Sequence, residues 1–163
     1  VRVAGDELDD AVMQYVKKEF SLAIGDRTAE EIKIQMGSAW PMEEELTADI
    51  RGRDLVSGLP RTIQLTTEHV REALAEPVAA IVDAVKTTLD KTPPELAADI
   101  MEDGITVTGG GALLGGLDDR LHHETGMPIR IAHEPLYSVV VGSGRALENI
   151  DAMRGLMSLG GDD

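Results

Sequence analysis

The chain of 163 residues contains no cysteine. This absence excludes disulfide bonds, thiol catalysis and cysteine-ligated zinc or iron–sulfur sites. Aromatic residues are scarce, with one tryptophan, two tyrosines and one phenylalanine. Because hydrophobic residues still make up 42% of the sequence, we expect a core of aliphatic side chains. The length predicts one or two domains.

Long hydrophobic runs are also missing, since no stretch approaches the roughly 20 apolar residues that span a bilayer. No basic-then-apolar leader marks a secreted protein, so we expect a cytoplasmic location. Basic residues are few, with 15 lysines and arginines against 30 acidic residues and a net charge of −15. This charge repels phosphate backbones and anionic lipid headgroups, so we expect no nucleic-acid partner and no direct insertion of this chain into a membrane.

Hydrophobic spacing predicts the order of helices and strands along the chain. We expect helices over residues 6–20, 28–40, 67–90, 95–101, 112–124 and 136–150, and strands over 46–51, 62–66, 105–108 and 129–131. Thr28 and Glu31 have the spacing of a capping box, and Pro41 is expected to end that helix. Pro77 removes a backbone hydrogen bond from the longest helix and predicts a kink there. The strand–helix–strand order after residue 104 predicts a parallel α/β layer.

The glycines at 109–111 directly follow a predicted strand. Without a Cβ, their backbone can approach a ligand closely, and a following helix would offer free N–H groups. The segment matches neither a phosphate-binding Walker loop nor a dinucleotide fingerprint. The pattern alone therefore leaves a ligand site and an ordinary turn as alternatives. For Gly142 and Gly144, in the last predicted helix, two explanations are equally favoured: close packing, and close approach to a ligand or to a neighbouring subdomain.

The remaining polar residues predict no catalytic residue and no metal site. His122 and His123 are adjacent and point about 100° apart on a helix, so they cannot chelate one ion together. His69 and His133 are isolated, and the acidic run at 43–45 is expected to be a solvated loop.

Four segments of the chain are VAGDELD at 3–9, TAEEIK at 28–33, KTPPEL at 91–96 and VTGGGALL at 107–114. Together they resemble the MreB family of bacterial actins. Their order and spacing match the family, and the likeness extends to about Ile150. The family belongs to the superfamily of actin, the sugar kinases and the heat-shock chaperones. The resemblance therefore implies an α/β fold, the second half of an actin-like (ribonuclease H-like) fold. A mixed sheet with flanking helices would carry a small α+β outer subdomain.

The resemblance also implies a division of the chain into parts. Residues 1–3 would end a strand of the inner subdomain, residues 4–66 would form the outer small subdomain, and residues 67–135 the inner large subdomain. Residues 136–163 would form a helix returning toward a first domain and a frayed tail. In the family the two phosphate loops, the catalytic acidic residue and the membrane-contacting elements precede Val1, so we expect this chain alone to be inactive.

A nucleotide site is implied by the same resemblance. Glu30 and Lys33 match the family's Glu-x-x-Lys, which lines the adenosine, and the usual arginine between them is Glu31 here. Residues 109–112 match the family's adenosine motif. The implied cofactor is ATP, with Mg²⁺ expected only with the first domain. The implied nucleotide-binding residues are Glu30, Glu31, Ile32, Lys33, Gly109, Gly110, Gly111 and Ala112.

The function implied by the resemblance is structural. The whole protein would form nucleotide-dependent filaments that maintain rod cell shape by organising cell-wall synthesis at the cytoplasmic face of the membrane. Its implied partners are further copies of itself, cell-wall synthesis proteins and membrane-associated proteins. Two alternatives stay open, half of a sugar kinase-like enzyme and a binding module without catalysis. The matches at 28–33 and 91–114 favour the filament protein.

Overall fold

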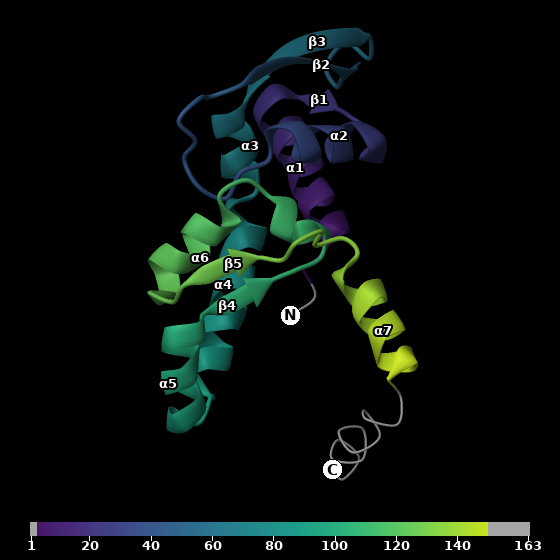
Figure 1. The fold of residues 1–163 in the computed structure, drawn as a ribbon. Helices are drawn as coiled ribbons and strands as arrows, with labels where there is room; N and C mark the ends of the chain where they lie inside the picture. The colour runs from purple at the N-terminus through teal and green to yellow at the C-terminus, as the bar shows by residue number, and fades with distance from the viewer. Residues whose placement is uncertain (1–2, 150–163) are drawn as a thin grey trace.

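The computed structural model describes residues 3–149 and contains two separate sheets, one at the top of the view and the other near the middle of the molecule (Figure 1). In the first sheet, β1 (Leu22–Ala23), β2 (Thr47–Asp54) and β3 (Pro60–Thr66) pair in that order and are antiparallel. In the second, β4 (Ile105–Val107) and β5 (Ile129–Ile131) are parallel, as the sequence predicts. The α/β class is confirmed. The predictions for residues 1–2 and 150–163 lie outside the described residues, and Val3 is not part of a strand.

Eight helical segments accompany the sheets in the described part of the chain. They are α1 (Gly5–Phe20), α2 (Asp26–Met36), α3 (Thr67–Ala73), α4 (Ala75–Asp90), α5 (Pro94–Asp103), the 3-10 helix η1 (Gly110–Leu113), α6 (Leu117–Thr125) and α7 (Ser138–Glu148). No helix among residues 3–149 is long and apolar enough to cross a membrane.

The predicted kink near Pro77 is confirmed as a break between α3 and α4. Because proline has no N–H, the carbonyl of the residue four positions earlier loses its helical partner. That residue, Ala73, is the last of α3, and Leu74 separates the two helices with φ −84° and ψ −2°. The predicted helix 67–90 is therefore two helices that share one buried stripe.

The bounds of α2 differ from the prediction at both ends. The helix begins at Asp26 after Gly25, with no side-chain cap, so the capping box of Thr28 and Glu31 is wrong. Glu31 instead pairs with Arg27, 3.0 Å away within the same helix. The helix also ends at Met36, well before Pro41, because the backbone turns to an extended conformation at Gly37.

The helix predicted directly after the three glycines does not begin there. Residues 110–113 form the short helix η1, and α6 begins only at Leu117. Gly116 separates them with φ +65°, a left-handed conformation that L-residues other than glycine rarely adopt. The N-terminus of α6 therefore lies at Leu117, and the helix does not begin at residue 112 as predicted.

The core is aliphatic, as the composition predicts, and it is continuous. Its buried cluster includes Leu8, Val12, Val16, Leu22, Ile32, Leu65, Val70, Leu74, Val78, Val82, Leu114, Leu117 and Leu121. Residues from α3 and α4 run through this cluster and link the elements around both sheets. In contrast, α5 and α7 have no buried residue. On α7, the side chains of Val139, Val140 and Val141 are 71%, 64% and 45% exposed.

Candidate functional site

The end of α2 lies against the segment that follows the three glycines. The Gly37 carbonyl accepts a hydrogen bond from the Gly115 N–H at 3.3 Å, and the Gly115 carbonyl accepts one from the Ala39 N–H at 2.7 Å. Ser38, buried between them, forms an isolated parallel bridge with Gly115. A Cβ on Gly37 would lie 2.9 Å from the Leu114 Cδ1 atom, so the contact is close. Two segments that are far apart in the sequence therefore meet at this junction.

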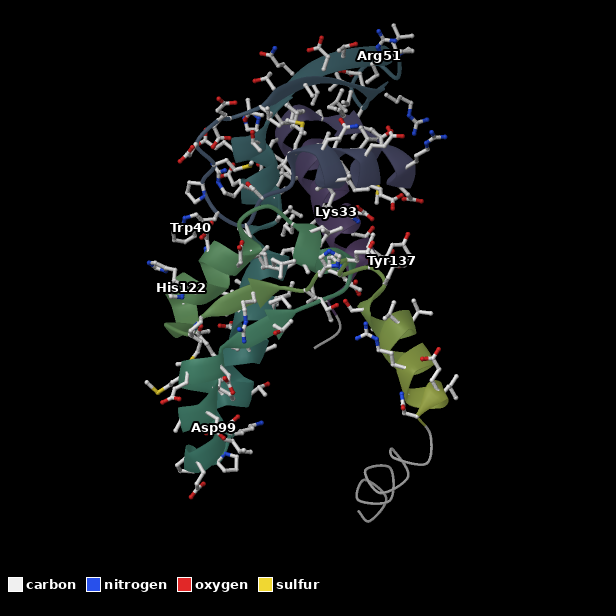
Figure 2. The ribbon with its side chains drawn as sticks, in the orientation of Figure 1. Lys33, Trp40, Arg51, Asp99, His122 and Tyr137 are labelled. Carbon is white, nitrogen blue, oxygen red and sulfur yellow. The ribbon has the colours of Figure 1, made fainter. Side chains whose placement is uncertain are left out.

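Lys33 is in α2, one helical turn before this junction, and its side chain reaches α1 (Figure 2). Its Nζ atom is 2.9 Å from both carboxylate oxygens of Asp9, and it lies 3.3 Å from the Gly5 carbonyl oxygen. The side chains of Lys33 and Asp9 are only 16% and 15% exposed. The ammonium group is therefore occupied by acceptors from the first turns of α1.

The other predicted residues of α2 have different environments. Glu30 is exposed, and Glu31 is exposed and paired with Arg27. Ile32 is 2% exposed and packs in the core. Its side chain therefore supports the helix, and its place among the binding residues stays a prediction.

The three glycines differ in backbone conformation and in how closely other atoms pack around them. Gly109 has φ +85°, and its N–H donates to the Pro135 carbonyl at 3.0 Å. A Cβ on Gly110 would meet the Leu136 Cδ2 atom at 3.4 Å, an ordinary contact. Gly111 has no positive φ, and nothing lies within 4 Å of a Cβ built there. Neither the backbone conformation nor internal packing therefore requires glycine at position 111. Ala112 is buried, with 5% exposure.

The sequence prediction missed two parts of this region. Asp9 carries no signal in its spacing that would link it to Lys33, because the pairing depends on how α1 packs on α2. The loop before α7 lies beside the glycines through the Gly109–Pro135 hydrogen bond and a second bond from Thr108 Oγ1 to the same carbonyl, at 3.0 Å. Tyr137, in that loop, is 58% exposed (Figure 2).

A cavity of about 290 Å³ borders the junction through Ala39 and contains none of the predicted residues. It is lined by Ala39, Trp40, Pro41, Arg71, Ala75, Val78 and Arg120. Arg71 donates to Ser38 Oγ at 3.2 Å and pairs with Glu45 at 2.8 Å. The hydrogen bond from Arg71 lowers the pKa of Glu45. The acidic run at 43–45 is exposed, as predicted, and this ion pair ties Glu45 to α3.

The histidines have structural surroundings. His122 Nδ1 lies 2.7 Å from the Met127 carbonyl, and the ring of His123 lies 4.9 Å from that of Trp40. The ring of His69 packs edge-on against Phe20 at 5.3 Å. Among residues 3–149, no three histidine, aspartate or glutamate residues come together in a way that could hold a metal ion. Around Gly142 and Gly144, nothing lies within 4 Å of an added Cβ, so neither glycine is explained by close packing within residues 3–149.

Comparison with known proteins identifies relatives along nearly the whole chain. The family model described as MreB/Mbl protein matches residues 1–155. The cell shape-determining protein Mbl of Bacillus subtilis is 48% identical over 153 residues, which cover 94% of this chain and 46% of that protein. The cell shape-determining protein MreB of Escherichia coli is 48% identical over 151 residues, covering 93% of this chain and 44% of that protein. The chain thus spans about half the length of the relatives it matches.

Solved structures lead to the same family. The crystal structure of MreB5 of Spiroplasma citri bound to ADP matches with a TM-score of 0.89 and 39% identity, over 92% of this chain and 46% of that one. The MamK double helical filament matches with a TM-score of 0.67 at 20% identity, over 84% of this chain and 42% of that one, and shows the fold alone. The described residues form part of an actin-like fold, and the chain belongs to the MreB/Mbl protein family.

Proposed function

We propose that this chain supplies the base-and-sugar half of an ATP site in a filament-forming, actin-like protein that determines cell shape. The observation that carries this proposal is the open space at Gly111. Gly111 lies just after β4, and because neither its backbone conformation nor packing within residues 3–149 requires glycine there, the position leaves room for a ligand to approach the backbone. This space lies next to the junction at which the end of α2 meets the segment after η1.

Glu30, Lys33 and the glycines at 109–111 have roles in this proposal that their environments permit. The exposed Glu30 carboxylate accepts hydrogen bonds from ribose hydroxyls, and the aliphatic stem of Lys33 lies along the base. The glycines at 109–111 let their backbone approach the sugar and the α-phosphate. The related Spiroplasma citri structures are described as bound to ADP and to AMPPNP, which supports an adenine nucleotide as the ligand. Mg²⁺ and the β- and γ-phosphates would be held by residues outside this chain.

The proposal extends to the organisation of the whole protein. Residues 4–66 would form an outer subdomain and residues 67–135 an inner one, with the nucleotide between them. Relatives named for cell shape determination support a structural role, through self-association into filaments in this proposal. We further propose that the whole protein acts at the cytoplasmic face of the membrane with cell-wall synthesis proteins. A sugar kinase function receives no support from these relatives.

The test is an NMR titration of the isotope-labelled chain with ATP. We expect binding no tighter than about millimolar, or roughly −4 kcal/mol, because the contacts to the outer phosphates are missing. The shifted signals should include those near Lys33 and those of residues 109–112. Gly111→Val should weaken binding by at least about tenfold, by filling the space that the ligand needs.

Gly144→Val is the matched control. This glycine also has open space around it and no positive φ, but it lies in α7. It should leave ATP binding unchanged. The proposal fails if ATP shifts neither segment, or if the two valine variants bind ATP equally well.

A further inference from the structure

The ion pair between Lys33 and Asp9 fixes the direction of a long side chain. Lysine has four methylene groups and rotates freely when its ammonium is solvated. Here Nζ donates to Asp9 Oδ2 at 2.9 Å and to the Gly5 carbonyl at 3.3 Å. Asp9 Oδ1 also lies 2.9 Å from Nζ but accepts no hydrogen bond. The stem is thus stretched from α2 to the beginning of α1, and both ends are fixed.

Asp9 is itself firmly placed. It follows Leu8, which is 4% exposed and belongs to the core cluster, so the second turn of α1 cannot rotate without disturbing the core. The backbone N–H of Ala4 donates to the Glu7 carboxylate at 2.9 Å and secures the start of the same helix. The anchor for the lysine ammonium is therefore part of a rigid helix end.

We infer that Asp9 is a positioning residue for the nucleotide site, an inference that rests on the proposed function. Asp9 draws the ammonium of Lys33 toward α1 and leaves the aliphatic stem as the surface along which a base can lie. The Lys33 side chain is already ordered in the folded chain. Binding a nucleotide therefore costs no further conformational entropy of this side chain. Without this anchor, a mobile and strongly hydrated cation would be free to enter the space for the base.

A charge-reversed pair separates this role from a purely structural one. In the double variant Asp9→Lys with Lys33→Asp, the ion pair between the helices can form again, but the methylene stem now comes from α1. We expect this variant to recover the thermal stability that Asp9→Asn loses. We also expect it to bind adenosine at least about tenfold more weakly than the unchanged chain. Adenosine is the probe because it is uncharged and tests only the base and the sugar.

Asp9→Asn alone gives a second test, should the reversed pair fail to fold. It keeps the shape of the side chain, removes the charge that holds Nζ, and should also weaken adenosine binding at least about tenfold. Its control is Glu19→Gln, which breaks the exposed 3.2 Å pair with Lys18 on the same helix and should leave binding unchanged.

The outcomes are distinct. Loss of adenosine binding in a stable reversed pair, accompanied by loss in folded Asp9→Asn, supports the inference. If the reversed pair restores both stability and binding, or if Asp9→Asn binds like the unchanged chain, Asp9 is only structural and the inference is overturned while the nucleotide site stands. If the unchanged chain gives no adenosine-dependent shift near Lys33, the proposed function fails and the inference fails with it.

Discussion

Gly116→Ala should destabilise the protein by acting directly on the junction between η1 and α6. At this position φ is +65°, which costs an alanine about 1–2 kcal/mol. An added Cβ would also lie 2.6 Å from the Cβ of Trp40, so one of the two segments must shift. Overpacking of this kind costs about 1–3 kcal/mol. The two contributions predict a loss of about 2–5 kcal/mol in the free energy of unfolding.

Gly126→Ala separates the two contributions. Gly126 has a similar φ of +71°, but nothing lies within 4 Å of a Cβ built there. It should lose only the conformational part, about 1–2 kcal/mol. Urea unfolding can be followed by circular dichroism and by the fluorescence of Trp40, the single tryptophan of the chain. If the two variants were equally destabilised, the contact between Gly116 and Trp40 would carry no energy and the reasoning would be refuted.

Three further predictions concern pH, hydrolysis and assembly. The Ser57 backbone N–H and the Arg61 guanidinium lower the pKa of Asp54 from 3.8 to about 2. The stability that Asp54 contributes is therefore present above about pH 4 and lost as pH falls through about 2. Asp54→Asn should reduce the dependence of the free energy of unfolding on pH across this range. The chain should release no phosphate from ATP above background, since the family's phosphate loops have no match in it, and steady release abolished by Gly111→Val would contradict this. The chain should form no ordered filaments with ATP at micromolar concentration. Association must overcome several kcal/mol of lost rigid-body freedom, and we expect only part of each filament interface in this chain. Regular protofilaments in electron micrographs would contradict this prediction.

The sequence predicts the elements well where the pattern is long or where a residue has a single strong effect. The stripe that passes through Val70 and Val78 identifies the longest helical region, and Pro77 breaks it because proline lacks an N–H. In contrast, β1 has only two residues, which is too short for an alternation to be recognised. The capping-box pattern predicts too late a start for α2, because a threonine and a glutamate at that spacing also occur within helices.

The candidate site was harder to predict, because its parts come together only through tertiary packing. The family resemblance, not the periodicity, identifies Lys33, whereas the three glycines after a predicted strand already indicate a candidate ligand site. That the ammonium of Lys33 is held by Asp9 follows from how α1 lies on α2, which no local pattern contains. The helix expected after Gly111 is replaced by η1, since the left-handed backbone at Gly116 delays α6.

The continuous aliphatic cluster has a consequence for cooperativity. Because α3 and α4 share one buried stripe with elements around both sheets, neither sheet can lose its packing while the other keeps it. The proposed subdomains should therefore melt together as one folding unit, and the slowest amide hydrogen exchange should fall on these two helices. The helices α5 and α7 bury no residue, so their amides should exchange through local opening, long before the rest of the molecule unfolds.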